Sequence, residues 1–278
     1  MQHERIPCTA IIPTLNSEKV LRRCLVSIAD FAEIILVDGN STDATHAIAK
    51  EFGARIIKQK ETDEPNIRID NFTEVRQKGL AAATHHWVVN IDSDEWFSEG
   101  LIDEIREVVK KNDPFVALQA KDLIVLDDGD GVVVQHAWSY PHISMLRLYN
   151  TLGDTYLRAG KKVHERWIIG EKTKELVAKN IVYFSYRPYA EFREKTSYYL
   201  GLALQEYRGH TITVSQYFKY IIYRNVRASA VICVRVILTY LRYGVKNVLP
   251  IKFVAQSLRY QLMLIVLGTR VFYEQHFL

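Results

Sequence analysis

The sequence predicts an α/β protein with a mostly parallel sheet, followed by a helical region of different character. Over residues 1–111, short apolar runs alternate with segments of helical spacing, which is typical of parallel strands joined by crossover helices. The charges are divided unevenly. Residues 1–185 hold 23 Lys and Arg against 28 Asp and Glu, whereas residues 186–278 hold 13 against 4. We therefore expect an acidic α/β part and a basic helical part with different partners.

The first half of the chain predicts strands and helices in alternation. Strands are expected over 9–13, 33–38, 54–58 and 87–92. Helices are expected over 17–31, 42–52, 71–84 and 99–111, where apolar residues recur at helical spacing. The second of these helices begins at a capping residue, Ser41 or Thr42. An added β region follows, with strands over 116–125, 132–136 and 145–149 and a turn over 127–131.

Beyond Arg187 the pattern is helical and basic. Helices are expected over 191–208, 214–247 and 251–272, with Pro250 as the break. On a helical wheel the basic residues of the last two helices form one stripe each: Arg224, Arg227, Arg235, Arg242 and Lys246, then Lys252, Arg259 and Arg270. This pattern is typical of helices that lie in a membrane interface, and the alternative is a pair of core-packed helices with a solvated basic face. The absence of acidic residues between Glu206 and Glu274 favours the membrane.

Composition excludes several classes of protein. The 278 residues carry a net charge of +4 and are 48% hydrophobic, which fits a globular protein and not a disordered or collagenous one. No uncharged apolar stretch of about 18 residues predicts a transmembrane helix. The N-terminal segment is too short and too acidic for a signal peptide. Three cysteines with no metal-ligand spacing favour a reducing compartment.

The most informative cluster is Asp92-Ser93-Asp94-Glu95, at the end of an apolar strand. Carboxylates this close repel one another and become favourable around a hard divalent cation. Alternate residues of an extended strand point the same way, so Asp92 and Asp94 are expected to aim at one site. In an open α/β sheet that edge binds ligands. The alternative is an acidic turn that caps a helix.

Two further blocks place polar residues after buried strands: Pro13-Thr14-Leu15-Asn16, and the run from Val37 to Thr45, Val-Asp-Gly-Asn-Ser-Thr-Asp-Ala-Thr. Together with the Asp-x-Asp at 92–94, this order resembles family 2 glycosyltransferases of the GT-A fold over residues 7–170. The Val-His-Glu at 163–165 is similar to a subgroup that includes lipopolysaccharide-core glucosyltransferases. The chain lacks the Gln-x-x-Arg-Trp signature of processive synthases, which indicates addition of a single sugar.

The resemblance implies roles for individual residues. Asp92 and Asp94 would bind Mg²⁺ or Mn²⁺, with His164 as a further candidate ligand. Glu165 would be the general base of an inverting transfer, and Asp94 would be a second catalytic residue. Acceptor contacts would come from Trp96, His164 and Trp167. The nucleotide sugar would be bound by Pro13, Thr14, Asn16, Asp38, Asn40, Arg76, Lys78, Asp92 and Ser93.

Alternatives exist for several of these side chains. Arg76 and Lys78 could equally form an exposed helix face, and the family often has Arg-Asn where this chain has Gln77-Lys78. Glu165 could be one half of a surface ion pair. The tryptophans could be core or rim residues.

The predicted organisation is a GT-A catalytic domain over 1–190 and a basic helical region over 191–278. Within the first, 1–97 would bind the nucleotide sugar and 98–190 the acceptor. We expect transfer of one sugar, with a UDP-hexose as donor, to a lipid-linked or cell-surface glycan such as lipopolysaccharide core. Residues 210–278 would dock on an anionic membrane, at the cytoplasmic face of the inner membrane, and no nucleic-acid partner is expected. The alternatives are a nucleotidyltransferase, which the lack of a glycine after the first strand disfavours, and a catalytically dead membrane-binding module.

Overall fold

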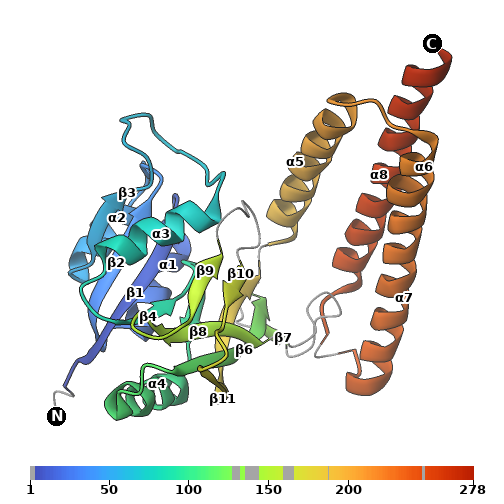
Figure 1. Cartoon of the computed structure of the whole chain (residues 1–278). Helices are drawn as coiled ribbons and strands as arrows, with labels where there is room; N and C mark the ends of the chain where they lie inside the picture. The colour runs from blue at the N-terminus through green and yellow to red at the C-terminus, as the bar shows by residue number, and fades with distance from the viewer. Residues whose placement is uncertain (1–3, 127–131, 135–143, 159–165, 187, 246–247) are drawn as a thin grey trace. The chain divides into compact units, whose positions relative to one another are not determined.

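A computed structural model describes residues 4–126, 132–134, 144–158, 166–186, 188–245 and 248–278 (Figure 1). The chain divides into two compact units. One comprises Met1–Leu123 and His142–Ser185, and the other comprises Ile124–Pro141 and Tyr186–Leu278.

The first unit is built on a sheet with helices on both faces. The strands of that sheet in this unit are β1 (Ile6–Thr14), β2 (Phe31–Asp38), β3 (Arg55–Lys58), β4 (Trp87–Asn90), β5 (Glu95–Phe97), β6 (Val116–Leu126), β8 (Ser144–Asn150) and β11 (Lys174–Tyr186). Two further strands, β9 (Tyr156–Arg158) and β10 (Arg166–Ile168), pair with each other in a separate two-stranded sheet. Its helices are α1 (Glu18–Ser27), α2 (Thr45–Glu51), α3 (Phe72–Ala82) and α4 (Glu99–Lys111).

The sheet has the order β3-β2-β1-β4-β8-β6-β11-β5, and β7 (Val132–Val134) pairs with β6. The first four strands are parallel, whereas β8 pairs antiparallel with both β4 and β6. The parallel strands confirm the predicted α/β class. In their register Thr14 lies opposite Asp38, so the ends of β1 and β2 bring their polar residues to one edge.

Alternating side chains of the parallel strands bury both faces of the sheet, as expected for strands covered on two sides. On one face, Ala10 and Ile12 pack in a cluster with residues of α1, α2 and α4. On the other face, Ile11 packs with Val75 of α3. These two layers hold the carboxyl ends of β1, β2 and β4 in place beneath the candidate site.

Some boundaries differ from the sequence prediction. The fourth strand ends at Asn90 rather than at Asp92, because residues 92–95 turn back with the Glu95 N–H donating to the Asp92 carbonyl at 3.0 Å. The first helix ends at Ser27, and Phe31 already starts the next strand. The long strand β11 was not predicted, because its run Lys-Glu-Leu-Val-Ala-Lys-Asn lacks a clean alternation of polar and apolar residues.

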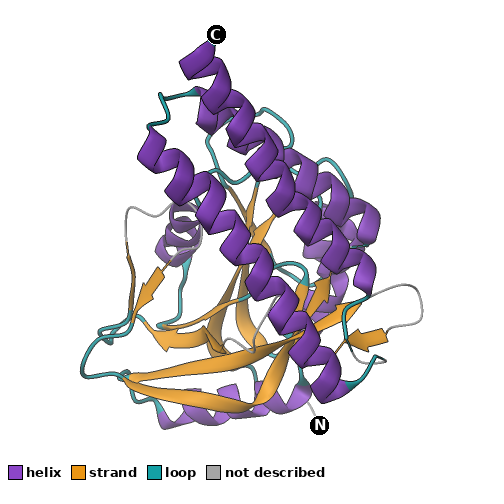
Figure 2. Ribbon diagram, turned by 90° about the vertical axis from the view of Figure 1, so that its right-hand side faces the viewer, coloured by secondary structure: helices purple, strands orange, loops and turns teal. Residues whose placement is uncertain are grey.

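The second unit contains the helices α5 (Tyr189–Arg208), α6 (Val214–Gln216), α7 (Arg224–Tyr243) and α8 (Ile251–Phe277). A π-helical segment, η1 (Tyr217–Tyr223), joins α6 to α7. The buried Asn225 side chain donates to the Ile221 carbonyl at 2.7 Å, so it hydrogen-bonds a backbone group of the widened segment. In Figure 1, α7 and α8 are long helices, and α8 packs against both α5 and α7; Figure 2 draws all the helices in purple.

Candidate active site

The site is assembled at the carboxyl ends of β1, β2 and β4. Asp38, the last residue of β2, is buried, and its carboxylate accepts hydrogen bonds from the Thr14 hydroxyl at 2.8 Å and from the Ser41 N–H at 2.8 Å and hydroxyl at 2.6 Å. His46 Nε2 lies 2.7 Å from Asp38 Oδ2, and its side chain is 42% exposed. Asp38 therefore ties the ends of β1 and β2 together, and His46 is the solvent-facing member of this cluster.

The asparagines Asn16 and Asn40 adopt left-handed backbone conformations, with φ of 48° and 56°. Asparagine tolerates this region better than most residues. The Asn40 amide donates to the carbonyls of Thr62 and Glu64 at 2.8 and 2.7 Å. The Asn16 amide donates to Asn66 Oδ1 at 2.8 Å. Both side chains thus hold the connection that runs from β3 to α3 against the strand ends.

The same connection crosses Gly39 closely. The Ile67 N–H donates to the Gly39 carbonyl at 2.7 Å. A Cβ atom on Gly39 would lie 2.2 Å from the Ile67 carbonyl oxygen, a contact that backbone atoms cannot relieve cheaply. Glycine is therefore required at position 39, within the run from Val37 to Thr45. Pro13 lies within β1, buried and paired with Val37, and its contact with the nucleotide sugar stays a prediction.

Asp92 follows β4 and is held by Arg76 from α3. Arg76 Nη2 lies 2.6 Å from Asp92 Oδ1, and Nη1 donates to the Ile11 carbonyl at 3.4 Å. The Arg76 side chain is 6% exposed, whereas that of Asp92 is 47% exposed. Arg76 is therefore placed to orient Asp92, whereas Lys78 is partly exposed and lies 3.7 Å from Glu61.

The turn after β4 is held by several further contacts. Ser17 donates to the Ser93 hydroxyl at 3.0 Å, and the Ser185 N–H donates to the Asp94 carbonyl at 2.8 Å. Burial, followed by the charges of Glu95, Asp94 and Asp92, raises the pKa of the Cys24 thiol well above its ordinary value. The three carboxylates thus converge on one region, although through a turn rather than the extended backbone expected.

Glu95 belongs to a buried ion-pair network. Its carboxylate accepts from Arg147 Nη1 and Nη2 at 2.6 and 2.8 Å and from the Asp92 N–H at 2.9 Å. Arg147, on β8, also donates to Asp122 at 2.6 Å. Burial is the largest influence on Glu95 and raises its pKa, while Arg147 opposes the shift. Burial alone would lower the pKa of Arg147, but its two carboxylate partners outweigh burial and raise it.

This network changes the interpretation of the acidic cluster. Glu95 is buried and fixes the Asp92 amide, whereas the side chains of Asp92 and Asp94 are partly exposed. A divalent cation held by one or two carboxylates and by substrate phosphates is the usual arrangement for Mg²⁺, so the donor set fits such an ion. Within the described residues, no group of three or more His, Cys, Asp or Glu side chains is placed to hold a metal.

The two tryptophans pack against other aromatic rings. Trp96 stacks on Tyr183 with centroids 5.4 Å apart, and the Arg23 guanidinium lies 4.6 Å from the Trp96 ring centroid. Trp167, on β10, packs on the buried Tyr149 with ring centroids 4.6 Å apart. Both indoles are half-buried, so each packs against its neighbours and is also partly exposed to solvent.

His164 and Glu165 fall in the connection between β9 and β10, outside the described residues. Their assignments as metal ligand, acceptor contact and general base stay predictions.

Sequence reasoning missed Arg147, His46 and Asn66. The clearest signal was Arg147 itself, an arginine in the middle of a predicted apolar strand, because a buried cation requires a buried carboxylate partner. His46 and Asn66 gave no comparable signal, since their partners lie in other elements: Asp38 at the end of β2 and Asn16 after β1.

The order of strands and helices is that of the GT-A fold of glycosyltransferases. The sequence model described as Glycosyl transferase family 2 matches residues 9–160. The chain belongs to this family.

Relatives among curated proteins agree with this assignment. The chain is 34% identical over 147 residues to an uncharacterized glycosyltransferase of Rickettsia typhi, covering 51% of this chain and 46% of that protein. It is 30% identical over 112 residues to the lipopolysaccharide core biosynthesis glycosyltransferase LpsC of Rhizobium meliloti, covering 40% of each. The chain thus matches less than half the length of these relatives. Among solved structures, S. aureus TarS is similar over 96% of this chain and 55% of that one, with 18% identity and a TM-score of 0.44.

Proposed function

We propose that the protein transfers one sugar from a nucleotide-diphosphate sugar, with a UDP-hexose as the preferred donor, to a lipid-linked or cell-surface glycan acceptor. The observation that carries this proposal is the placement of Asp92 and Asp94 at the carboxyl end of β4, beside the loops of β1 and β2. In an open α/β sheet, this edge is where nucleotides bind.

In this proposal Asp92 and Asp94 hold Mg²⁺ or Mn²⁺ against the donor diphosphate. The metal, when bound, supplies Lewis-acid stabilisation of the departing nucleotide. Arg76 fixes the Asp92 carboxylate through the 2.6 Å ion pair, and Glu95 fixes the Asp92 amide. Because the Asp92 carboxylate and amide are already held, donor binding does not have to order this residue, and the free-energy cost of doing so is avoided.

The nucleoside would lie over the ends of β1 and β2. Asp38 has its oxygens engaged by Thr14, Ser41 and His46. Its proposed role is therefore to shape this surface, with the exposed His46 ring as the group nearest to solvent. Glu165 is proposed as the general base that takes the proton of the acceptor hydroxyl, with inversion at the transferred sugar. His164, Trp96 and Trp167 are proposed to contact the acceptor.

The lipid-linked acceptor is proposed from the helical unit and from the lipopolysaccharide relative. Exposed apolar side chains of α7 include Val234, Ile237 and Leu241, and the exposed Arg227 and Arg242 lie before and after them on the same helix. Apolar residues beside arginines are typical of a helix that lies in a membrane surface. In the described part of the chain, no helix has the length and apolarity needed to span a bilayer. We propose peripheral attachment to the inner face of the cytoplasmic membrane.

A thermal-shift screen of UDP-, GDP- and CMP-sugars, with and without Mn²⁺, tests the donor assignment. We expect a UDP-sugar to raise the unfolding temperature only when Mn²⁺ is present, because a ligand that binds the folded state alone stabilises it. Asp94→Asn should abolish the shift. Asp103→Asn, an exposed aspartate on α4, is the matched control and should retain it. A shift that is equal in Asp94→Asn and the wild type would contradict the metal site.

A further inference from the structure

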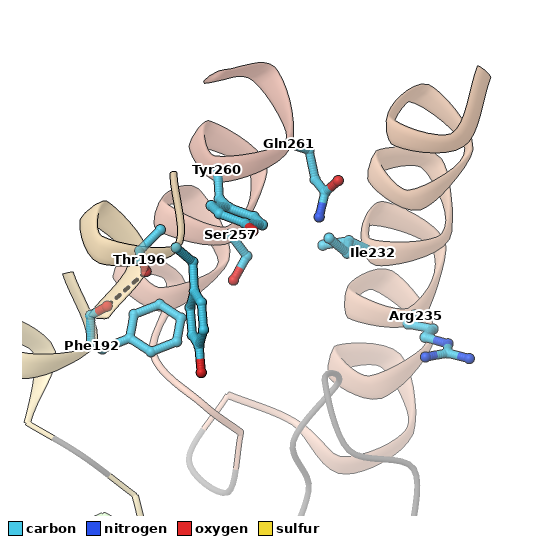
Figure 3. A pocket seen from close by; sticks show the side chains of 8 residues that line it. Phe192, Thr196, Ile232, Arg235, Ser257, Tyr260 and Gln261 are labelled. Carbon is cyan, nitrogen blue, oxygen red and sulfur yellow. Dashed lines mark hydrogen bonds between the residues drawn. The ribbon is translucent and has the colours of Figure 1, made fainter. Parts of the chain in front are cut away.

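A crevice lies within the helical unit, remote in sequence from the motifs of the transferase site. It has a volume of about 370 Å³ and is lined by side chains of α5, α7 and α8. This volume falls in the roughly 300–1,000 Å³ range of small-molecule sites. Figure 3 shows Phe192 from α5, Tyr260 from α8 and Ile232 from α7 around the space. Its walls are therefore mainly apolar and aromatic.

The polar groups of the crevice differ in whether they already have a hydrogen-bond partner in the protein. The Thr196 hydroxyl donates to the Phe192 carbonyl at 2.7 Å, within α5 (Figure 3). Among the residues that the structure describes, by contrast, no protein group hydrogen-bonds the Ser257 hydroxyl, the Gln261 side-chain amide or the Arg235 guanidinium. These three groups are free to bind a ligand.

The charge of the lining is of one sign. Among the described side chains that line the crevice, Arg235 is the one ionised residue, and no acidic residue lies between Glu206 and Glu274 in the sequence. An arginine cation in a lining that also carries hydroxyl and amide groups is suited to a phosphate group. The crevice thus combines an apolar interior with an anion-binding edge.

The surroundings of the crevice are apolar and exposed. Val231, Val234 and Leu238 of α7 are 37%, 55% and 60% exposed, and they flank Ile232 and Arg235 along the same helix. An apolar chain held between the helices can therefore continue onto an exposed apolar surface, as expected for a molecule taken from a membrane.

We propose that this crevice binds a single lipid, with its apolar chain between Phe192, Tyr260 and Ile232 and its phosphate at Arg235. A lipid-linked acceptor belongs to this chemical class, and that identification alone rests on the function proposed above. Lipid binding itself does not require the transferase site.

The probe is a lysophosphatidic acid, which has one acyl chain and one phosphate, used below its micellar concentration with the full-length chain. Native mass spectrometry gives the stoichiometry, and a titration gives the affinity. We expect a one-to-one complex. Ile232→Trp, which fills the crevice, should weaken binding at least tenfold, and Arg235→Gln should weaken it to a similar extent.

Arg193→Gln is the matched control, because Arg193 is exposed on α5 but does not line the crevice. It should bind the probe as the wild type does. Equal losses in Arg235→Gln and Arg193→Gln would show diffuse surface attraction and would overturn the proposal, as would wild-type affinity in Ile232→Trp. The proposal would also be overturned if inorganic phosphate competed with the probe as effectively as the lipid does. Because no donor is present, failure here leaves the transferase proposal intact.

Discussion

Arg147→Met offers the sharpest test of how the candidate site is held. Arg147 is 3% exposed and neutralises Glu95 and Asp122, both within 2.8 Å. Methionine roughly preserves the volume but leaves two carboxylates without a cation in a poorly solvated place. Removing one partner of a buried ion pair costs about 3–5 kcal/mol. For a unit of this size each kcal/mol lowers the unfolding temperature by about 2–4 °C, so we expect a fall of roughly 6–20 °C.

The pH dependence gives a second signature. Burial already raises the pKa of Glu95 and of Asp122, and loss of Arg147 should raise both further. A carboxyl group whose pKa is higher in the folded state favours folding when it is protonated, and this contribution is lost as pH rises through the folded-state pKa. The destabilisation of Arg147→Met should therefore be smaller at pH 5 than at pH 8.

The assay is thermal unfolding at both pH values, followed by circular dichroism. Arg22→Met is the control, because Arg22 pairs with Glu51 on the surface, where both side chains are more than half exposed. It should change the unfolding temperature little at either pH. A loss in Arg147→Met as small as that of the control, or one that does not vary with pH, would refute the buried network.

Three other predictions follow from the same contacts. Arg76→Met should weaken Mn²⁺-dependent UDP binding several-fold, because Asp92 loses its 2.6 Å partner; calorimetry that gives wild-type affinity would contradict this. Glu104→Gln should cost about 1 kcal/mol at pH 7 after allowance for solvent screening. Burial tends to raise the pKa of Glu104, but hydrogen bonds from Lys179 and Asn180 outweigh it and lower the pKa, so the cost should shrink as urea unfolding is repeated at falling pH. Leu241→Glu, at a position 79% exposed, should reduce sedimentation with anionic liposomes while leaving the unfolding temperature unchanged; unchanged sedimentation would count against the membrane surface.

Sequence patterns predicted the strands and helices of the parallel half of the sheet because each buries a continuous apolar run. They failed where structure depends on distant partners. The turn at residues 92–95 was expected to be extended, since no local pattern shows that Glu95 pairs with Arg147 of β8. The π-helical segment was likewise hidden within a uniform helical pattern, because its signal is one buried side chain, Asn225.

The same distinction applies to the site residues. Asp92, Asp94 and Asp38 could be placed at one sheet edge from their positions after strands. The role of Arg76 could not, because an arginine on a helix gives no indication in the sequence of whether it meets a ligand or a neighbouring carboxylate. In the structure Arg76 contacts the Asp92 carboxylate at 2.6 Å, and its contact with the nucleotide sugar stays a prediction.

The central claim is that Asp92 and Asp94 bind a nucleotide through a divalent metal. Isothermal titration of UDP into the full-length chain, with Mn²⁺ and then with EDTA, tests it most directly. We predict one-site binding with Mn²⁺, loss of binding in EDTA, and loss in Asp94→Asn but not in Asp103→Asn. UDP binding that is equally tight in EDTA and in Asp94→Asn would contradict the claim.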